Sequence, residues 1–489
     1  MRVRFAPSPT GNLHIGTLRA ALFNWLYAKH HKGSFVLRIE DTDLQRSEKQ
    51  YETNIFAGLS WLGLTVDEGP EQSGSVAPYR QSERIEHQLY QKAAMELIDK
   101  GLAYYCFLTD EDITKKRAEA KEKGTIFLHP RTHESLTKQE IDLKIKNNEP
   151  YTIRFKMNAK KIITFKDMIR NPIDFDCSII SDFVILKSDG SPSYNFAVVV
   201  DDSSMKITHV IRGEDHISNM PKQLALYEAL GHKTPDFAHL PMILGPDKSK
   251  LSKRHGATAV TDYRDQGFLP EALLNYLALL GWSPKDEQEL LSSDEIIEQF
   301  GMDRVNKSNA VFDIQKLTWM NGQYIRKLVK EELFNKTLPY LAAEKKAAFN
   351  KLSIEQQQNA FLAVQDNLDT LLDINRYIDV FLDSDADIQL KQKEIKWNKT
   401  DITVLKQLEI MLNEKEFKTV KEFTSLLELI CEKTGFGKGK VFKPIRFALT
   451  GMGSGPHISE LCSFFGTEII INRVSFCLGL MENENNKSA

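Results

Sequence analysis

Two short polar segments, more than two hundred residues apart in this 489-residue chain, contain residue types that bind phosphate. The first holds His14, Gly16 and Thr17, follows the turn-forming stretch Pro7–Asn12 and opens a predicted helix. The first amide groups of a helix are unpaired and its dipole is positive there, so this end attracts anions. His14 and Thr17 lie three residues apart, on one face, and both can reach a phosphate. Gly16 has no side chain where a nucleotide must approach the backbone closely.

The second segment is a loop with three lysines and two serines, Lys248–Lys253, and no acid inside it. Like-charge repulsion makes such a loop costly unless an anion occupies it. Lysines that close over a triphosphate can stabilise the charge that grows on the α-phosphate and on departing pyrophosphate. The predicted chemistry is therefore in-line attack by a carboxylate on the α-phosphate, with Mg²⁺ helping the leaving group.

Each segment alone has a plainer explanation. A single histidine at a helix start is more often a cap or a core residue, and a short lysine loop is more often solvated surface. Both segments, however, follow a strand candidate, and they occur in the order expected for two halves of a split nucleotide-binding fold. We therefore predict one site assembled from both halves.

The hydrophobic pattern alternates strands and helices in the first part of the chain. Residues 3–6 and 35–39 are predicted strands that flank a helix over 15–31, and this order implies a right-handed crossover and a parallel sheet. A polar stretch, 102–194, interrupts the alternation, and helices dominate beyond Pro270. We expect an α/β fold in which a Rossmann-like parallel-sheet catalytic domain carries an α+β insertion and is followed by an all-α region. The elements expected after the insertion are a strand over 207–212, a helix over 220–230 and a segment over 242–244 that leads into the lysine loop.

Composition and charge indicate an ordinary soluble protein. The apolar and charged fractions are 42% and 27%, and a formal net charge of −3 argues against a surface that binds nucleic acid indiscriminately, though not against a local basic face. The five cysteines are scattered without a Cys-x-x-Cys pair, which favours a reducing compartment. The N-terminus has no signal-like apolar core, and no run of about 18 apolar residues occurs. We expect a cytoplasmic protein that does not enter a membrane.

The motifs around both segments resemble those of class I aminoacyl-tRNA synthetases, specifically the bacterial-type glutamyl-tRNA synthetases. The histidine signature of this family corresponds to His14–Thr17, and its lysine signature corresponds to Lys250–Arg254. The resemblance covers the chain densely to about Ile325 and more loosely beyond it. The other segments that carry it are Phe5–Gly11, Arg38–Asp43, Pro78–Arg84, Lys187–Gly190, Tyr194–Phe196, Val200–Asp202 and Ile211–His216.

The resemblance implies a role for each matched residue. Arg4 and Arg212 would hold the side-chain carboxylate of the amino acid, a task that suits the guanidinium fork, and Glu40 would receive its α-ammonium group. The plainer alternative for Arg4 is a surface ion pair, and for Glu40 it is a structural cap. The remaining residues are polar neighbours of the amino acid (Ser8, Tyr194), catalytic residues at the phosphates (His14, Thr17, Lys250, Lys253) and ATP-binding residues (Gly16, Glu214, Asp215, Lys253).

The implied reaction is the ATP-dependent ligation of L-glutamate to the 3′ end of tRNA(Glu), through a glutamyl-adenylate, with release of AMP and pyrophosphate. ATP would bind with Mg²⁺, and no metal site held by the protein is expected. Two arginines match an acidic side chain better than an amide, so glutamate is favoured over glutamine. The family further implies that tRNA must bind before glutamate is activated. We expect the enzyme to be a monomer.

The resemblance also divides the chain and gives the helical C-terminus a partner. There, Lys433–Arg446 contains five basic residues, two aromatic residues and no acid, a composition that suits a phosphate backbone with bases to stack on. We predict that Lys438, Lys440, Lys443 and Arg446 contact tRNA; the alternative is a solvated basic loop. The expected domains are residues 1–103, the first half of the catalytic domain; 104–193, an acceptor-binding insertion; 194–245, the second half of the catalytic domain; 246–325, the lysine loop and a helical stem-contact domain; and 326–489, a helical anticodon-binding domain.

Three features depart from the family pattern. Thr17 replaces the second signature histidine, so more of the transition-state charge should fall on the lysines. Relatives that bind zinc in the insertion use a Cys-x-Cys pair; here Cys106 has no such partner, and His129 and His133 are too isolated to complete a tetrahedral set, so we predict no structural zinc. Some members carry an arginine before a Leu/Phe-Asp-Thr-Leu stretch, where it discriminates the third anticodon base. Residues 367–371 lack that arginine, which favours charging of tRNA(Gln) as well.

Other functions share parts of this pattern. A nucleotidyltransferase that adenylates a small carboxylic acid would have the histidine and lysine segments without a long helical C-terminus. A shortened relative that modifies tRNA with glutamate lacks the same region. A non-catalytic RNA-binding scaffold has no reason to retain Lys250, Lys253 and Glu40 together. Glutaminyl-tRNA synthetase is the nearest alternative, and Arg212 argues against it.

Overall fold

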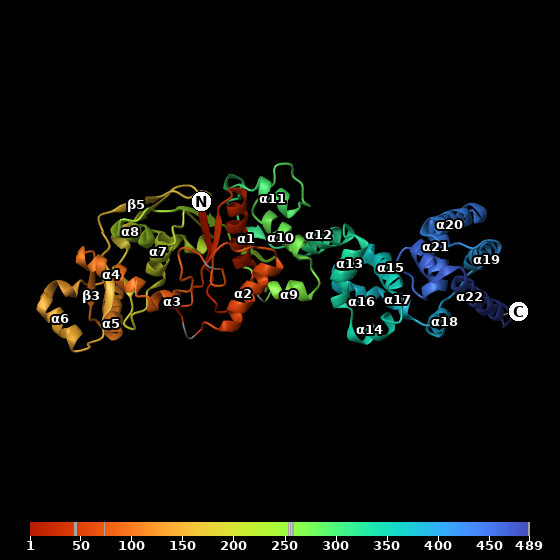
Figure 1. The fold of residues 1–489 in the computed structure, drawn as a ribbon, viewed down its shortest axis with the longest axis horizontal. Coiled ribbons are helices and arrows are strands. Elements are labelled where there is room, and N and C mark those ends of the chain that lie inside the picture. Colours follow the sequence, from red (N-terminus) through yellow and green to blue (C-terminus); the bar gives the residue numbers. More distant parts are fainter. Residues whose placement is uncertain (44–45, 73, 253, 255, 257–258, 488–489) are drawn as a thin grey trace. The chain divides into compact units, whose positions relative to one another are not determined.

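The protein is described by a computed structural model that covers residues 1–43, 46–72, 74–252, 254, 256 and 259–487 (Figure 1). The chain forms two compact units. One unit comprises Met1–Asp262 and Leu273–Asp313, and the other comprises Tyr263–Ala272 and Ile314–Ala489. The division into five domains stays a prediction.

Parallel strands form the centre of the first unit, and a helix connects two of them. The parallel pair β1–β2 is joined through α1, which confirms the expected strand–helix–strand order. In the second parallel pair, β8–β9, Arg212 lies opposite His239. The amide of Thr208 donates a hydrogen bond to the carbonyl of Arg2 at 3.0 Å, which brings β1 beside β8. These elements are β1 (Arg2–Phe5), α1 (Ile15–His30), β2 (Ser34–Leu37), α2 (Lys49–Trp61), α7 (Tyr194–Ser204), β8 (His209–Gly213), α8 (Met220–Leu230) and β9 (Asp236–Leu240).

Helix α1 is buried on most of its surface because strands and helices surround it. Its apolar side chains, such as Ile15, Leu18 and Leu26, are fully buried. Its buried polar side chains bond to backbone carbonyls: Asn24 donates to Ile211 at 2.9 Å, and Arg19 donates to Leu280 at 2.9 Å. These contacts fix the helix whose first turn carries the histidine signature.

The insertion is an α+β structure, as predicted. Strands β3, β4 and β7 form an antiparallel sheet, and β5 and β6 form an antiparallel pair. Thr109 and Thr137 begin two helices with reciprocal capping bonds to the acids three residues later. Two helices, α3 (Gln81–Glu86) and α4 (Leu89–Asp99), lead into the sheet. The elements of the insertion are β3 (Ala103–Cys106), α5 (Asp110–Glu122), α6 (Lys138–Lys146), β4 (Thr152–Phe155), β5 (Ile162–Phe165), β6 (Ile173–Asp176) and β7 (Phe183–Leu186).

The lysine loop leaves a short strand, β10 (Ile243–Leu244), that pairs in parallel with β11 (Ala310–Val311). The prediction that helices dominate beyond Pro270 is confirmed, with β11 as a two-residue exception. Helices α9 (Val260–Asp265), α10 (Pro270–Leu279) and α11 (Ser293–Gln299) follow the loop.

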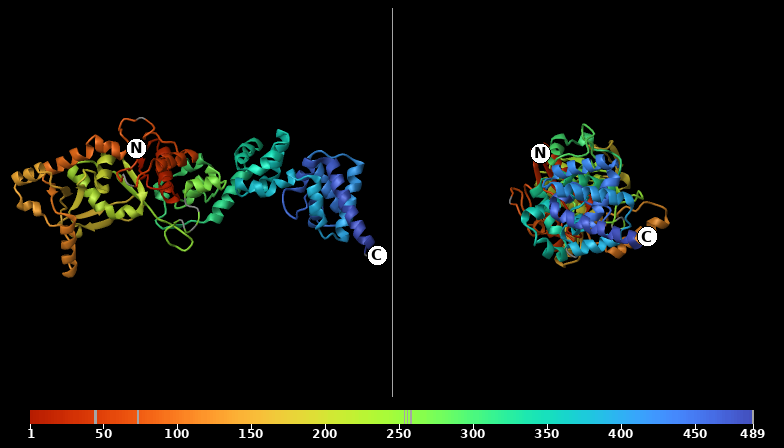
Figure 2. Two further views of the ribbon diagram at one scale, coloured as in Figure 1. Left: turned by 90° about the horizontal axis from the view of Figure 1, so that it is seen from below. Right: turned by 90° about the vertical axis from the view of Figure 1, so that its right-hand side faces the viewer.

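The second unit is helical, and its last four helices pack as a bundle (Figure 2). Ile458–Met481 of α22 is long and apolar enough to cross a membrane by length and composition, but 44% of its apolar window is buried in the unit. Arg473 within it pairs with Asp385 at 2.9 Å, so this segment fits a core helix. The principal helices are α12 (Ile314–Arg326), α13 (Lys330–Thr337), α14 (Ala343–Phe349), α15 (Ile354–Val364), α16 (Ile374–Tyr377), α17 (Asp379–Leu382), α18 (Asp385–Lys393), α19 (Lys399–Glu414), α20 (Val420–Thr434), α21 (Lys438–Thr450) and α22 (Ile458–Lys487).

Candidate active site

The histidine signature lies at the start of α1. His14 is the residue before the first helical turn, and its carbonyl accepts a hydrogen bond from Leu18 at 2.9 Å. Its Nε2 lies 3.0 Å from the hydroxyl of Thr17, so this hydroxyl orients the imidazole. A methyl group at Gly16 would lie 3.3 Å from Cε1 of the same ring. The absence of a side chain at position 16 therefore leaves room for the ring as well as for a ligand.

The chain just after the lysine loop returns to the histidine signature. The amide of Val260 donates to the carbonyl of Leu13 at 3.0 Å, and Nζ of Lys250 lies 3.8 Å from Oδ2 of Asp215. Partial burial and then the charge of Lys250 lower the pKa of His14, while Asp215 opposes this effect. His14 therefore binds a proton less readily than a free imidazole does. Lys253 lies outside the described residues.

Arg4 and Glu40 belong to a buried charge network. Nε of Arg4 lies 3.2 Å from Oδ1 of Asp202, and both side chains are almost fully buried. Arg38 donates to Glu40 at 3.0 Å and to Asp202 at 2.6 Å. A network in which each charge has an opposite partner avoids the large cost of an isolated buried ion. The ion pair expected as the alternative for Arg4 does exist, but it is buried rather than at the surface.

Arg212 differs from Arg4 because its bonds go to neutral groups. Its Nε donates to Nε2 of His239 at 3.1 Å, and its Nη2 donates to Oε1 of Gln223 at 2.8 Å. Its Nη1 is buried and has no hydrogen-bond partner among the described residues. Only 6% of Arg212 is exposed. A buried guanidinium with an unused donor is suited to an anionic ligand.

The other predicted site residues come from further segments of the first unit. The hydroxyl of Tyr194, at the start of α7, lies 2.9 Å from Nδ1 of His216, and Ser8 is exposed before α1. Glu214 forms an ion pair with Arg170 and accepts the amide of Met242 at 2.9 Å. The charge of Glu214 is thus already compensated, which leaves Asp215 beside the lysine loop.

Sequence reasoning missed several residues that hold the site together. Arg38 and Asp202 fall inside segments that carry the family resemblance, so those segments were a usable signal. Gln223 and His239 are single polar residues in apolar stretches, and nothing in their spacing indicated a role. Their importance depends on contacts with Arg212 that only the fold reveals.

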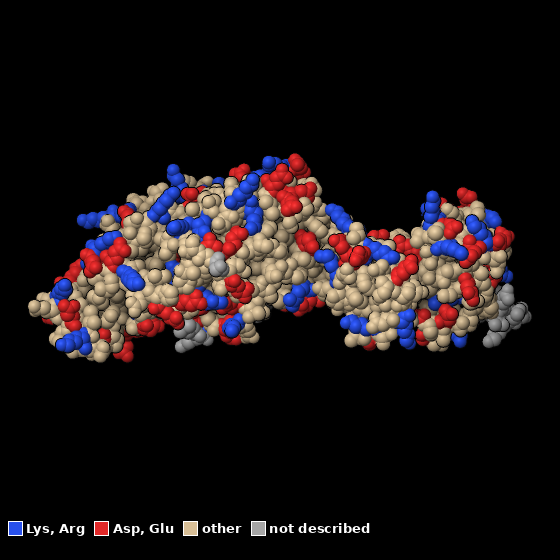
Figure 3. All heavy atoms as spheres, viewed as in Figure 1, with Lys and Arg blue, Asp and Glu red and all other residues tan. Residues whose placement is uncertain are grey.

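The predicted tRNA-binding residues lie along helix α21, not in a loop. Lys438, Lys440 and Lys443 are exposed. Arg446 is half-buried and donates to the carbonyl of Pro456. On the face shown in Figure 3, acidic and basic side chains are interspersed over the second unit. Three exposed lysines therefore lie on α21 within a mixed surface, and one of them, Lys438, is paired with Glu428 at 3.7 Å.

Cys106 and His129 are neighbours in the insertion although 23 residues separate them. The cysteine Sγ lies 3.6 Å from Nε2 of His129, and the hydroxyl of Tyr104 lies 3.1 Å from Nδ1. The His133 ring stacks on Tyr104. Within the described ranges, no group of three or more His, Cys, Asp or Glu side chains is placed to hold a metal ion. The prediction of no structural zinc stays a prediction.

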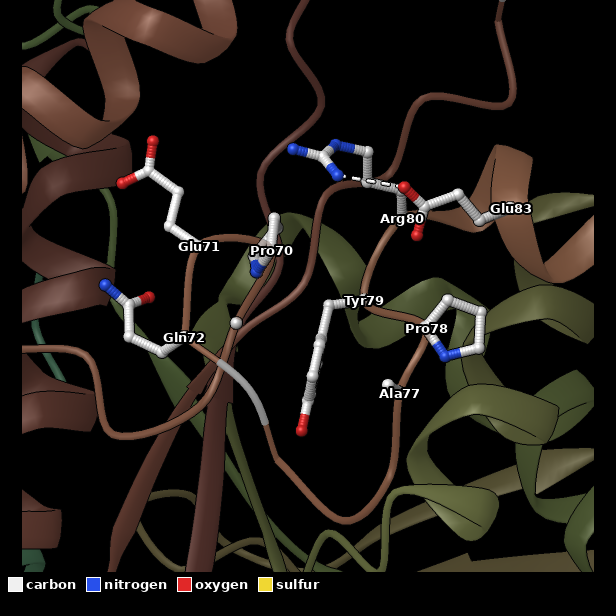
Figure 4. Close-up of a pocket in the computed structure, with 9 residues that line it drawn as sticks. Pro70, Glu71, Gln72, Ala77, Pro78, Tyr79, Arg80 and Glu83 are labelled. Carbon is white, nitrogen blue, oxygen red and sulfur yellow. Dashed lines mark hydrogen bonds and ion pairs between the residues drawn. The ribbon is translucent and has the colours of Figure 1, made fainter.

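A pocket of about 370 Å³ lies in the first unit, between the loop Gly69–Gln72 and the segment 77–83 (Figure 4). Its most prominent cation, Arg80, is paired with Glu83 at 2.9 Å and with Glu52 at 2.8 Å. The hydroxyl of Tyr79 donates to Glu68. Arg80, Glu83 and Tyr79 are therefore satisfied by bonds within the protein, and we assign no ligand to this pocket.

Comparisons with known proteins agree over nearly the whole chain. A family model described as tRNA synthetases class I (E and Q), catalytic domain, matches residues 1–319, and one described as anticodon binding domain matches residues 332–478. The chain is 42% identical over 487 residues to a glutamate–tRNA ligase of Natranaerobius thermophilus, covering 99% of both chains. It is 43% identical over 481 residues to that of a Sulfurihydrogenibium species, covering 98% of both.

Solved structures show the same relationship. A glutamate tRNA ligase from Elizabethkingia meningosepticum, solved in complex with its amino acid, has a TM-score of 0.84 and 34% identity over 98% of this chain and 99% of that chain. A glutamate-tRNA synthetase from Elizabethkingia anophelis has a TM-score of 0.82 at the same identity and coverage. The expected α/β catalytic fold with a helical C-terminal region is confirmed.

Proposed function

The chain belongs to the class I aminoacyl-tRNA synthetases as a glutamate–tRNA ligase, and from this premise we propose how its residues perform the reaction. The α-carboxylate of L-glutamate attacks the α-phosphorus of ATP, and pyrophosphate leaves. The terminal ribose hydroxyl of tRNA(Glu) then attacks the carbonyl carbon of the glutamyl-adenylate, and AMP leaves. Each turnover therefore consumes one ATP, forms one ester bond between glutamate and the tRNA, and releases pyrophosphate and AMP.

The observation that carries the proposal is the unpaired Nη1 of buried Arg212. A glutamate side-chain carboxylate would accept from it and would satisfy a donor that is otherwise costly to bury. Arg4 would add a second positive charge, although Asp202 already balances part of it. Glu40 would accept the α-ammonium group, and Ser8 and Tyr194 would line the same pocket.

The nucleotide would lie between the histidine signature and the lysine loop. His14 and Thr17 would donate to phosphate oxygens at the start of α1, where the helix amides favour an anion. Lys250 and Lys253 would stabilise the pyrophosphate as its charge grows. Gly16, Glu214 and Asp215 would border the nucleotide. Mg²⁺ bound to the triphosphate would neutralise part of its charge, and we assign no protein side chain to it.

The test is glutamate-dependent pyrophosphate exchange, measured with and without tRNA(Glu). We expect exchange only when the tRNA is present, with glutamate as substrate and glutamine inactive. Exchange that never requires tRNA would favour a nucleotidyltransferase that adenylates a small acid, and exchange with glutamine alone would favour a glutaminyl enzyme. Replacing Lys253 by Ala should reduce exchange far more than tRNA binding.

We further propose the partners and state of the enzyme. The insertion would hold the acceptor end, and Lys438, Lys440, Lys443 and Arg446 of α21 would contact the anticodon region. The enzyme would act as a monomer in the cytoplasm, without structural zinc. It would also charge tRNA(Gln), because the 367–371 stretch lacks a discriminating arginine.

A further inference from the structure

We propose that Gln223 determines the specificity of this site for an anionic side chain, because it binds Arg212 without neutralising it. The inference rests on the proposed function, in which Arg212 receives the glutamate side chain. Gln223 lies on α8 and is fully buried. Its Oε1 accepts from Nη2 of Arg212 at 2.8 Å, which fixes one edge of the guanidinium while the amide carries no charge.

The histidine partner of Arg212 is also kept neutral. Nε2 of His239 accepts from Nε of Arg212 at 3.1 Å, so this nitrogen carries no proton. The opposite nitrogen, Nδ1, lies 2.7 Å from Oδ2 of Asp167, which assigns the proton to Nδ1. Burial lowers the pKa of His239 although Asp167 opposes this. Nη2 also lies 3.0 Å from the sulfur of Met220. Three neutral acceptors therefore hold Arg212, and Nη1 remains the donor without a partner among the described residues.

The acidic side chains near Arg212 form ion pairs with other residues. In the described part of the chain, no carboxylate lies within ion-pairing distance of its guanidinium, in contrast to Arg4 with Asp202. Loss of water lowers the pKa of Arg212, and Arg4 adds to this effect, whereas Tyr194 and Asp202 oppose it. The neighbouring acids and their partners are Asp202 with Arg4 and Arg38, Glu40 with Arg38, Glu214 with Arg170, and Asp167 with His239.

An uncompensated buried cation gives a direct preference between substrates. A carboxylate ligand supplies the missing negative charge, whereas a neutral amide of the same shape leaves Arg212 unbalanced in a medium of low dielectric. If residue 223 carried a carboxylate, the protein itself would supply that charge. The site would then repel glutamate and would lose its reason to reject glutamine.

The substitution Gln223→Glu tests this idea because it changes charge with almost no change in shape. The present amide also donates from Nε2 to Oδ1 of Asn195 at 3.0 Å. Asn195 is half-buried, and rotation of its amide group by half a turn would present its NH₂ to the new carboxylate. Arg212 beside the carboxylate keeps it ionised.

We expect Q223E to raise the KM for glutamate by about 30-fold or more, a loss typical of a compensated charge at a buried contact. The KM for ATP, the affinity for tRNA(Glu) and the kcat at saturating glutamate should stay within about threefold. Exchange with glutamine, which we expect to be absent in the wild type, should become measurable in Q223E because the preference for glutamate falls. These values come from pyrophosphate exchange in the presence of tRNA(Glu).

Gln223→Met is the matched control, since it removes the hydrogen bond without adding charge. We expect Q223M to change the KM for glutamate by no more than about fivefold. Equal increases in Q223E and Q223M would mean that Gln223 only supports the structure, and an unchanged KM in Q223E would overturn the inference. If Q223E unfolds below the assay temperature, Asn195→Asp is the substitute, because it places the negative charge one contact further from Arg212. A rise of about fivefold in the KM for glutamate in N195D supports the inference, and an unchanged KM for glutamate contradicts it.

The wild-type enzyme separates this inference from the proposed function. If wild-type protein fails to activate glutamate in the presence of tRNA, the proposed function itself is wrong. If it activates glutamate and Q223E does so with the same KM, only the role of Gln223 is wrong.

Discussion

Arg38 and Asp202 lie 2.6 Å apart between Nη1 and Oδ1, although 164 residues separate them in the sequence. Each is also bound to a residue of the predicted amino-acid site, Arg38 to Glu40 and Asp202 to Arg4. Burial alone would raise the pKa of Asp202, but the charges of Arg4 and Arg38 outweigh it and the pKa is lowered. This pair therefore joins the two halves of the catalytic fold and sets the position of Arg4 and Glu40, the two predicted substrate-binding residues.

Replacement of Asp202 by Asn should destabilise the first unit by about 3 kcal/mol, because it leaves two buried guanidinium groups without their shared carboxylate. Urea unfolding measures this loss. Glu96→Gln is the control, since Glu96 and Lys100 form an exposed pair at 2.7 Å whose removal should cost less than about 0.5 kcal/mol. Equal losses in the two variants would show that the network contributes no more than a surface pair.

Thr17 orients His14, so Thr17→Val and Thr17→Ser should differ. Valine removes the hydroxyl that lies 3.0 Å from Nε2 of His14, and we expect kcat for pyrophosphate exchange to fall about tenfold. Serine keeps the hydroxyl and should remain within about twofold of the wild type. A similar loss in both variants would point to packing around the methyl group instead.

The elements that carry the signatures were predictable, whereas the contacts between them were not. The strand–helix–strand order around α1 follows from apolar spacing, and the resemblance located Arg4, Glu40 and Arg212. The sequence offered no sign that Asp202 takes part of the charge of Arg4 while Arg212 keeps its own. That difference depends on which side chains meet across β1, β8 and α8, and single-residue patterns do not contain this information.

Lowering the pH should reduce the folding stability of the insertion through protonation of His129. Burial and then the charge of Arg154 lower its pKa to about 4, against about 6.5 in the unfolded chain. Between these values the unfolded state binds the extra proton, so stability is complete above pH 6.5 and falls as the pH drops toward 4. We expect His129→Gln to remove about 1 kcal/mol of the loss between pH 7 and 5, because solvent screens part of the full effect of this shift. Urea unfolding at both pH values measures this, and parallel pH profiles for wild type and H129Q would contradict it.

The exposed lysines of α21 should contribute to tRNA affinity through charge alone. Lys440→Ala should weaken tRNA binding and reduce the slope of log Kd against log salt by about 1, because one phosphate contact is lost. Binding assays at several salt concentrations measure both effects. Lys336→Ala is the control, since Lys336 is paired with Glu271 at 3.0 Å, and it should leave the slope unchanged. An unchanged slope in K440A would favour the alternative, a solvated basic surface.

We expect charging of tRNA(Gln) to depend on whether an arginine can act at residues 367–371. Arg326 of α12 reaches this stretch from outside it, with Nη2 3.0 Å from the carbonyl of Asp366 and 3.6 Å from Oδ1 of Asp369. Asp369 compensates its charge, so we expect Arg326 to shape the stretch without selecting a base. Purified wild-type enzyme should therefore charge both tRNA(Glu) and tRNA(Gln), and Arg326→Ala should change the two rates by the same factor. If the wild type charges only tRNA(Glu) while R326A gains tRNA(Gln), then Arg326 is the discriminating arginine, supplied by α12 instead of by the stretch itself.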